Sequence, residues 1–200
     1  MKSWLIFLIL VAFLGAIVIY AAIADTYPVS VVNSRFVRAS DLNNDLAVAT
    51  NYYERMKALG TMAGGKITDQ YPGKIEIERA VLDKLVEASL IDEELNRRIS
   101  KEDLQGIIDK KVETAVSSSN IAQAALGKEV EALYGLQLNV FKKVVLVPQA
   151  KREILEGRML LESKTKDSGF DGWLEEAKSR ATVFILIPDF SWDGGRVVIK

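Results

Sequence analysis

Residues 75–104 read IEIERAVLDKLVEASLIDEELNRRISKEDL, and this stretch decides the fold. Its apolar residues recur at steps of three or four, as on one face of an α-helix. They include Ile77, Val81, Leu85 and Ala88. The spacing predicts an amphipathic helix that reaches about Arg98. Ser100 and Asp103 then resemble a capping box, which satisfies the exposed amides at a helix start. The stretch therefore predicts two consecutive helices.

The residues before this stretch predict a hairpin followed by another helix. Two β-prone runs, 29–32 and 36–37, flank residues 33–35, a pattern typical of a small hairpin. Ser40 or Asp41 can then accept a hydrogen bond from the first free amides of a helix. Apolar residues at helical spacing continue this helix to about Leu59, and we expect it to stop at Gly60. Residues 61–73 contain several glycines and predict a loop.

The residues after this stretch predict shorter helices and two strands. Helices are expected over 121–133 and 138–163, with a kink or break near Val147 because Pro148 removes an amide donor. A polar link over 164–169 precedes a short helix over 170–180. Residues 181–187 are β-prone, and 196–200 could add a second strand. We therefore expect a mainly α fold with one small β-sheet formed by strands near both ends.

The beginning of the chain predicts a membrane segment. Trp4 to Ala24 contains no charged residue, and about 20 apolar residues suffice for a helix to span a bilayer. Lys2 precedes this stretch and Asp25 follows it, which places the N-terminus in the cytoplasm. We expect a transmembrane signal-anchor over 1–24 and one exported domain over 25–200, with a main helical part over 28–163 and a returning part over 170–200. The alternative is a signal peptide cleaved after Ala24.

The composition disfavours several classes of function. Lys and Arg total 26 and Asp and Glu total 27, so no bulk charge attracts nucleic acid. The chain has no Cys, and therefore no disulfide, thiolate metal ligand or cysteine nucleophile. It also has no His, the commonest metal ligand and the usual general base. We expect no catalytic residues, no metal site and no cofactor.

Aromatic and methionine side chains suggest a surface for binding polypeptides. Both kinds of side chain adapt to varied partners. The candidate residues are Tyr52, Tyr53, Met56, Met62, Tyr134 and Phe141. Their helical spacing is equally consistent with ordinary core packing. The sequence therefore leaves both interpretations open, a binding surface and a packed core.

The order of motifs resembles a known family. Val31-Val32-Asn33 enters the predicted hairpin, and the run ERAVLDKLVE covers 78–87. ISKEDL follows at 99–104 and FDGWL at 170–174. Over roughly residues 28 to 190 this pattern resembles the SurA N-terminal chaperone-domain family, which includes relatives of the foldase PrsA and of trigger factor.

The resemblance implies a function in the cell envelope. Members hold unfolded or partly folded envelope proteins in an exported helical module, whose final helix and strand return to pack on its first part. The link over 162–170 is too short for the prolyl isomerase domain that many members insert there. We therefore expect a chaperone without ATP, anchored by a single pass in the bacterial cytoplasmic membrane with its domain outside, whose partners are unfolded or nascent envelope polypeptides. The alternatives are a scaffold that docks one envelope partner and a residual prolyl isomerase.

Overall fold

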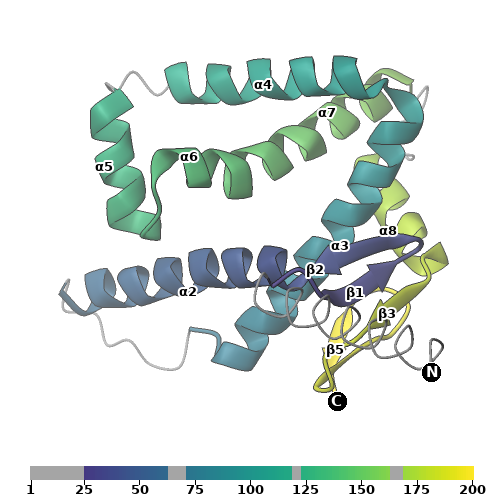
Figure 1. The fold of residues 1–200 in the computed structure, drawn as a ribbon, viewed down its shortest axis with the longest axis horizontal. Helices are drawn as coiled ribbons and strands as arrows, with labels where there is room; N and C mark the ends of the chain where they lie inside the picture. Colours follow the sequence, from purple (N-terminus) through teal and green to yellow (C-terminus); the bar gives the residue numbers. More distant parts are fainter. Residues whose placement is uncertain (1–24, 63–70, 119–122, 163–168) are drawn as a thin grey trace, which may run out of the picture.

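The computed structural model describes residues 25–62, 71–118, 123–162 and 169–200, and these residues are mainly helical. Short antiparallel strands from both ends of this region lie together at one side (Figure 1). The predicted transmembrane segment over 1–24 lies outside the described residues. The fold class expected for the remaining part, mainly α with a small sheet, is confirmed.

The predicted hairpin is present as β1 (Pro28–Val32) and β2 (Arg35–Arg38). The chain reverses at Asn33, which has a φ of 53°, a conformation that asparagine tolerates well. A β-bulge near Pro28 shifts the register between the two strands.

Helix α2 (Ala39–Met62) follows β2 directly and differs from the prediction at both ends. Its first amides donate to backbone carbonyls, Ala39 N–H to Tyr27 O at 2.9 Å and Ser40 N–H to Asp25 O at 2.7 Å. These bonds take the place of the expected Ser40 or Asp41 cap. The expected stop at Gly60 is wrong, since the helix continues to Met62. A single glycine raises the free energy of a helix by only about 1 kcal/mol relative to alanine and need not end it.

The stretch that decides the fold forms α3 (Lys74–Arg98) and α4 (Lys101–Ser117) as predicted. The Ser100 hydroxyl accepts a hydrogen bond from the Asp103 amide at 3.2 Å and donates one to the Asp103 carboxylate at 2.8 Å. This local cap separates the two helices, so the chain turns sharply between them (Figure 1).

The next segment contains α5 (Gln123–Tyr134), α6 (Leu138–Phe141), the π-helical turn η1 (Lys142–Leu146) and α7 (Val147–Glu162). The kink or break predicted near Val147 is not an interruption of the helix, because α6, η1 and α7 follow one another without a gap and only the hydrogen-bond spacing changes, over η1. Proline offers no N–H to the carbonyl four residues earlier and its ring clashes with it, so the backbone adopts the wider π spacing over this turn.

The returning part contains α8 (Phe170–Arg180), β3 (Val183–Ile185), β4 (Phe190–Trp192) and β5 (Val197–Ile199). β3 pairs antiparallel with β1, so strands from both ends do meet in one sheet of order β2-β1-β3. β4 and β5 form a separate two-stranded sheet, which corrects the expectation of a single sheet. Pro188 stands between β3 and β4, and a turn closed by Phe190 N–H and Ile187 O redirects the chain.

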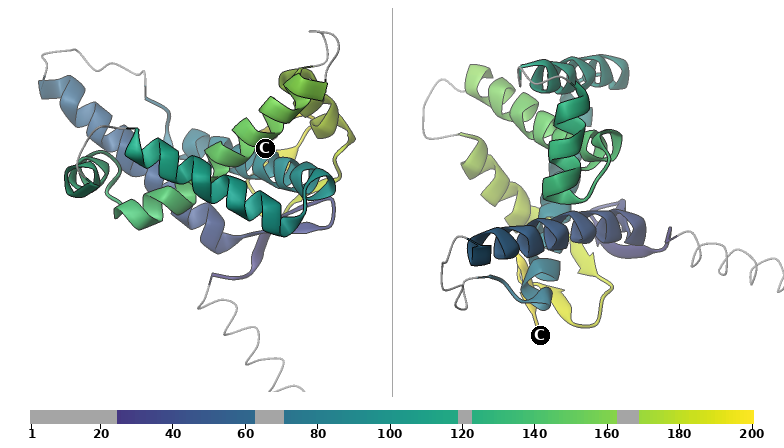
Figure 2. Two further views of the ribbon diagram at one scale, coloured as in Figure 1. Left: turned by 90° about the horizontal axis from the view of Figure 1, so that it is seen from above. Right: turned by 90° about the vertical axis from the view of Figure 1, so that its left-hand side faces the viewer.

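Two hydrophobic cores hold the described residues together, and α3 contributes to both. The first core joins β1, β2, α2, the first half of α3 and the β4-β5 sheet around Leu82 and Phe190. The second joins the end of α3 to α4, α7 and α8 around Leu95 and Leu155. In Figures 1 and 2, α4 and α7 form an upper layer and α2 with the strands a lower one. α3 connects the layers at one end and α5 descends onto α2 at the other.

Candidate functional site

A hollow of about 1020 Å³ opens between the two layers, bordered by β2, α2, α3, η1 and α7. Strand β2 contributes four consecutive residues, Arg35–Arg38, to its wall. Part of the lining is apolar and comes from separate elements. These residues are Pro28, Phe36, Val37, Leu85, Ala88, Ile91, Val144, Val145 and Pro148. The hollow therefore offers one apolar surface assembled from distant parts of the chain, which is hereafter called the interlayer hollow.

Ion pairs lie along the interlayer hollow. They are Lys84–Asp45 and Lys151–Asp92, both at 2.9 Å, and Arg152–Glu87 at 3.7 Å. Asp45 is buried, and this burial raises the pKa of its carboxyl group above the ordinary value although Lys84 donates a hydrogen bond to it. These pairs link α2 to α3 and α3 to α7 across the walls, so they contribute to the position of each wall.

Three further basic side chains line the interlayer hollow without a hydrogen bond or ion pair to another described residue. Arg35 and Arg38 stand on either side of Phe36 and Val37 on β2, and Lys143 lies on η1. Among the described lining residues, Asp41 is the one acidic side chain without such a partner. The hollow thus has an excess of positive charge available to a ligand.

The predicted aromatic residues do come together, at the end of the frame where α5 meets α2. The rings of Tyr52 and Tyr134 stack with centroids 5.6 Å apart, and Tyr134 contacts Phe141 at 4.9 Å. Tyr53 packs edge-on against Tyr52 at 5.8 Å. The Arg55 guanidinium also donates to the carbonyl of Ala132. We call these four rings the aromatic ladder, and they join α2 to α5 and α6.

The remaining predicted binding residues lie outside the aromatic ladder. Met56 is half-buried on α2, and Met62 is the last residue of α2, with a side chain outside the described part. None of the five predicted residues whose side chains the structure describes, Tyr52, Tyr53, Met56, Tyr134 and Phe141, lines the interlayer hollow. Their role in client binding stays a prediction, while their mutual contacts show that at least four of them pack against one another.

The sequence did not predict the interlayer hollow, because its walls combine segments far apart in the chain. One local signal was available. In the sequence, Phe36 and Val37 stand between two arginines in a short predicted hairpin, and in the structure 68% of Phe36 is exposed. An exposed aromatic side chain on a strand is a feature of binding surfaces more than of cores.

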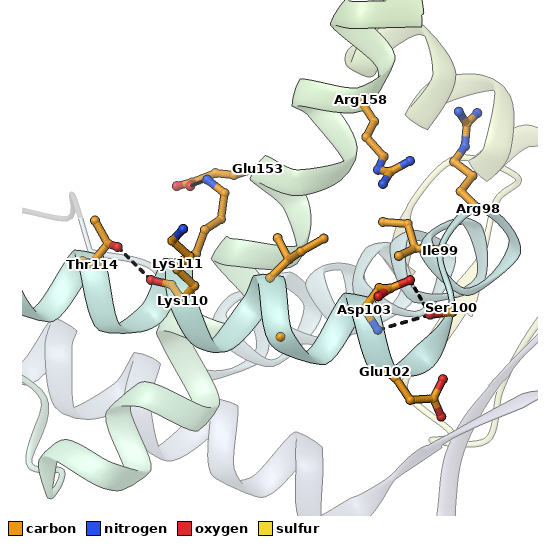
Figure 3. A pocket seen from close by; sticks show the side chains of 13 residues that line it. Arg98, Ile99, Ser100, Glu102, Asp103, Lys110, Lys111, Thr114, Glu153 and Arg158 are labelled. Atoms are coloured by element: carbon orange, nitrogen blue, oxygen red, sulfur yellow. Dashed lines mark hydrogen bonds and ion pairs between the residues drawn. The ribbon is translucent and has the colours of Figure 1, made fainter.

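A second hollow of about 990 Å³ lies between α4 and α7 and is strongly charged (Figure 3). Lys111 Nζ lies 2.9 Å from a carboxylate oxygen of Glu153, which joins the two helices. Arg158 points from α7 toward Ile99, whereas Glu102 points away (Figure 3). Its acidic and basic groups are exposed or half-buried, and all of them except Arg98 at the end of α3 lie on α4 and α7. This arrangement is that of a solvated groove between packed helices.

Among the described residues, no group of three His, Cys, Asp or Glu side chains could hold a metal ion. No helix in this part of the chain is long and apolar enough to cross a membrane. A scan against family models and searches of curated proteins and of solved structures found no match to the chain.

Proposed function

We propose that the chain is a membrane-anchored, extracytoplasmic, chaperone-like protein that holds unfolded or nascent envelope polypeptides without ATP. The observation that carries this proposal is the interlayer hollow. It is open, wide and partly apolar, with charges along its walls. Such a surface suits transient contact with many apolar segments, since the apolar groups supply attraction and the charges keep the surface hydrated.

The size of the interlayer hollow also favours a polypeptide ligand. Its volume of about 1020 Å³ lies just above the range of about 300 to 1000 Å³ for small-molecule pockets. Its apolar residues are spread over β1, β2, α3, η1 and α7, so a ligand must be extended to contact all of them. The apolar stretch over 4–24 supplies the proposed anchor, which would keep the hollow near the membrane surface.

The test is suppression of aggregation by the full-length chain in lipid nanodiscs. A chemically unfolded β-rich outer-membrane protein is diluted into buffer, and light scattering is followed with the chain in nanodiscs or with empty nanodiscs. We expect suppression without nucleotide. No suppression at several-fold molar excess would refute the chaperone proposal, and one stoichiometric crosslinked partner would then favour the scaffold.

Two phenylalanines provide a matched pair of variants for the same assay. Phe36 and Phe184 lie opposite Val31 on its two sides, so they occupy one row of the sheet. Phe36 lines the interlayer hollow and is 68% exposed, whereas Phe184 lies outside its lining and is 60% exposed. Phe36→Ala should weaken suppression and Phe184→Ala should leave it unchanged. Equal loss in both variants would contradict the assignment of the hollow as the binding site.

A further inference from the structure

Strand β2 has one unpaired edge, because the sheet order is β2-β1-β3. The two-residue turn at 33–34 makes Val32 and Arg35 the hydrogen-bonded pair that closes the hairpin. The next pair, Val31 and Phe36, is then the non-hydrogen-bonded one. The N–H and C=O groups of Phe36 therefore point away from β1, toward the unpaired edge.

This edge borders the interlayer hollow, whose wall includes all four residues of β2. Figure 1 shows β2 on the side of the sheet that faces the space between the layers. An edge of this kind carries backbone donors and acceptors that bind another strand readily. The hollow thus combines unpaired strand groups with apolar side chains on its opposite wall, among them Val144 and Val145.

The charges beside this edge indicate which strands fit it. Arg35 and Arg38 stand on either side of Phe36 and Val37, and Lys143 lies in the facing wall, all without an ion-pair partner among the described residues. Asp41 is the one acidic counterpart, so a bound segment meets a net positive surface. An acidic segment is attracted to such a surface, and salt screens that attraction.

We propose that the edge of β2 binds an extended, acid-bearing polypeptide segment as an added strand in the interlayer hollow. This inference rests on the proposed function and specifies its ligand and binding mode. Backbone hydrogen bonds would hold segments of varied sequence, while the apolar wall and the three basic side chains would favour segments that carry both apolar and acidic residues.

The test uses a fluorescent nine-residue peptide of alternating Val and Thr with Glu at both ends, and the full-length chain in nanodiscs. Phe36→Pro removes the outward N–H, whereas Phe36→Ala removes only the ring, and both should fold because that N–H makes no bond within the sheet. Circular dichroism and thermal melting check the fold. We expect anisotropy titrations to show about tenfold weaker binding for Phe36→Pro than for Phe36→Ala.

A second measurement changes the peptide and leaves the protein intact. Replacing backbone amides by esters removes N–H groups without adding bulk. Esters along one edge should be tolerated, since the peptide can pair through its other edge, whereas esters along both edges should weaken binding at least about tenfold. A version with Lys in place of Glu should bind more weakly at low salt, and the difference should shrink as salt rises.

Three outcomes overturn the inference. The first is equal binding by Phe36→Pro and Phe36→Ala, and the second is tight binding of the fully esterified peptide. The third is a stable dimer paired through β2, which would make a second copy of the chain the occupant. If aggregation is still suppressed in these cases, the proposed function stands and only strand addition fails. Absence of both suppression and peptide binding removes both proposals.

Discussion

Replacement of Tyr134 by leucine should loosen the junction between α2 and α5 without unfolding the rest of the protein. Tyr134 stacks on Tyr52 and also contacts Phe141, and each aromatic pair contributes about 0.5 to 1.5 kcal/mol beyond its buried area. Loss of both pairs removes about 1 to 3 kcal/mol from the closed junction. Because about 1.4 kcal/mol corresponds to a factor of ten, the open population should rise about five- to 150-fold.

Hydrogen–deuterium exchange followed by mass spectrometry measures this change. Amides of α5 and of the second half of α2 should exchange faster in the Tyr134→Leu variant, while those of α3 around Leu82 should keep the wild-type rate, because that side chain is fully buried in the first core. Leu133→Ala is the matched control, since Leu133 lies beside Tyr134 on α5 and is partly exposed. Unchanged exchange in α5, or an equal increase in α3, would refute the view that the aromatic ladder closes the frame.

Three further predictions concern stability, measured by urea unfolding of the full-length chain in detergent micelles with tryptophan fluorescence. Ser30→Ala should raise the free energy of unfolding by about 1 kcal/mol, because the buried Ser30 hydroxyl has no hydrogen-bond partner among the described residues. A lower free energy of unfolding would show that this hydroxyl is hydrogen-bonded in the protein. Ser100→Ala should lower the free energy of unfolding by about 1 kcal/mol through loss of the α4 cap, and an unchanged value would refute that role. Glu94→Gln should be less stable than wild type at pH 7 and equal to it in acid. Hydrogen bonds from Arg97 and then Arg98 lower the pKa of Glu94 in the folded protein. The ionised carboxylate therefore stabilises the fold above about pH 4.5, and this stabilisation is lost as the pH falls through the folded pKa. A difference in stability between the variant and wild type that persists in acid would contradict this.

Local patterns predicted most elements of this fold because each depends on nearby residues. The hairpin turn, the Ser100 cap and the irregular helical turn before Pro148 all follow from chemistry within about one helical turn. The end of α2 was misplaced because glycine weakens a helix without necessarily ending it, and residues beyond Gly60 continue it. The division into two sheets was not predicted, because it depends on which distant strand each terminal strand pairs with. β3 pairs with β1, and Pro188 follows β3 where the chain turns toward β4.

The candidate site was less predictable than the fold. Helical spacing identified the aromatic residues of α2 but could not show that Tyr52 faces Tyr134, which is 82 positions later in the chain. The interlayer hollow has walls from β2, α3 and α7, and its existence depends on how the two layers pack. Phe36 is the one local feature that indicates this site. Its exposure indicates a binding surface because β2 is an edge strand of the sheet.

The backbone bonds at the start of the domain have a consequence for timing in the cell. The carbonyl groups of Asp25 and Tyr27 accept hydrogen bonds from the first turn of α2. Only a few residues, about 10 to 14 Å of extended chain, therefore separate Ala24 from β1. With the proposed anchor in the membrane, so short a connection would hold the domain close to the membrane surface. A polypeptide that emerges at the membrane would meet the domain at a high effective concentration. Capture could then precede collision with other unfolded chains, even when the intrinsic affinity for each segment is weak.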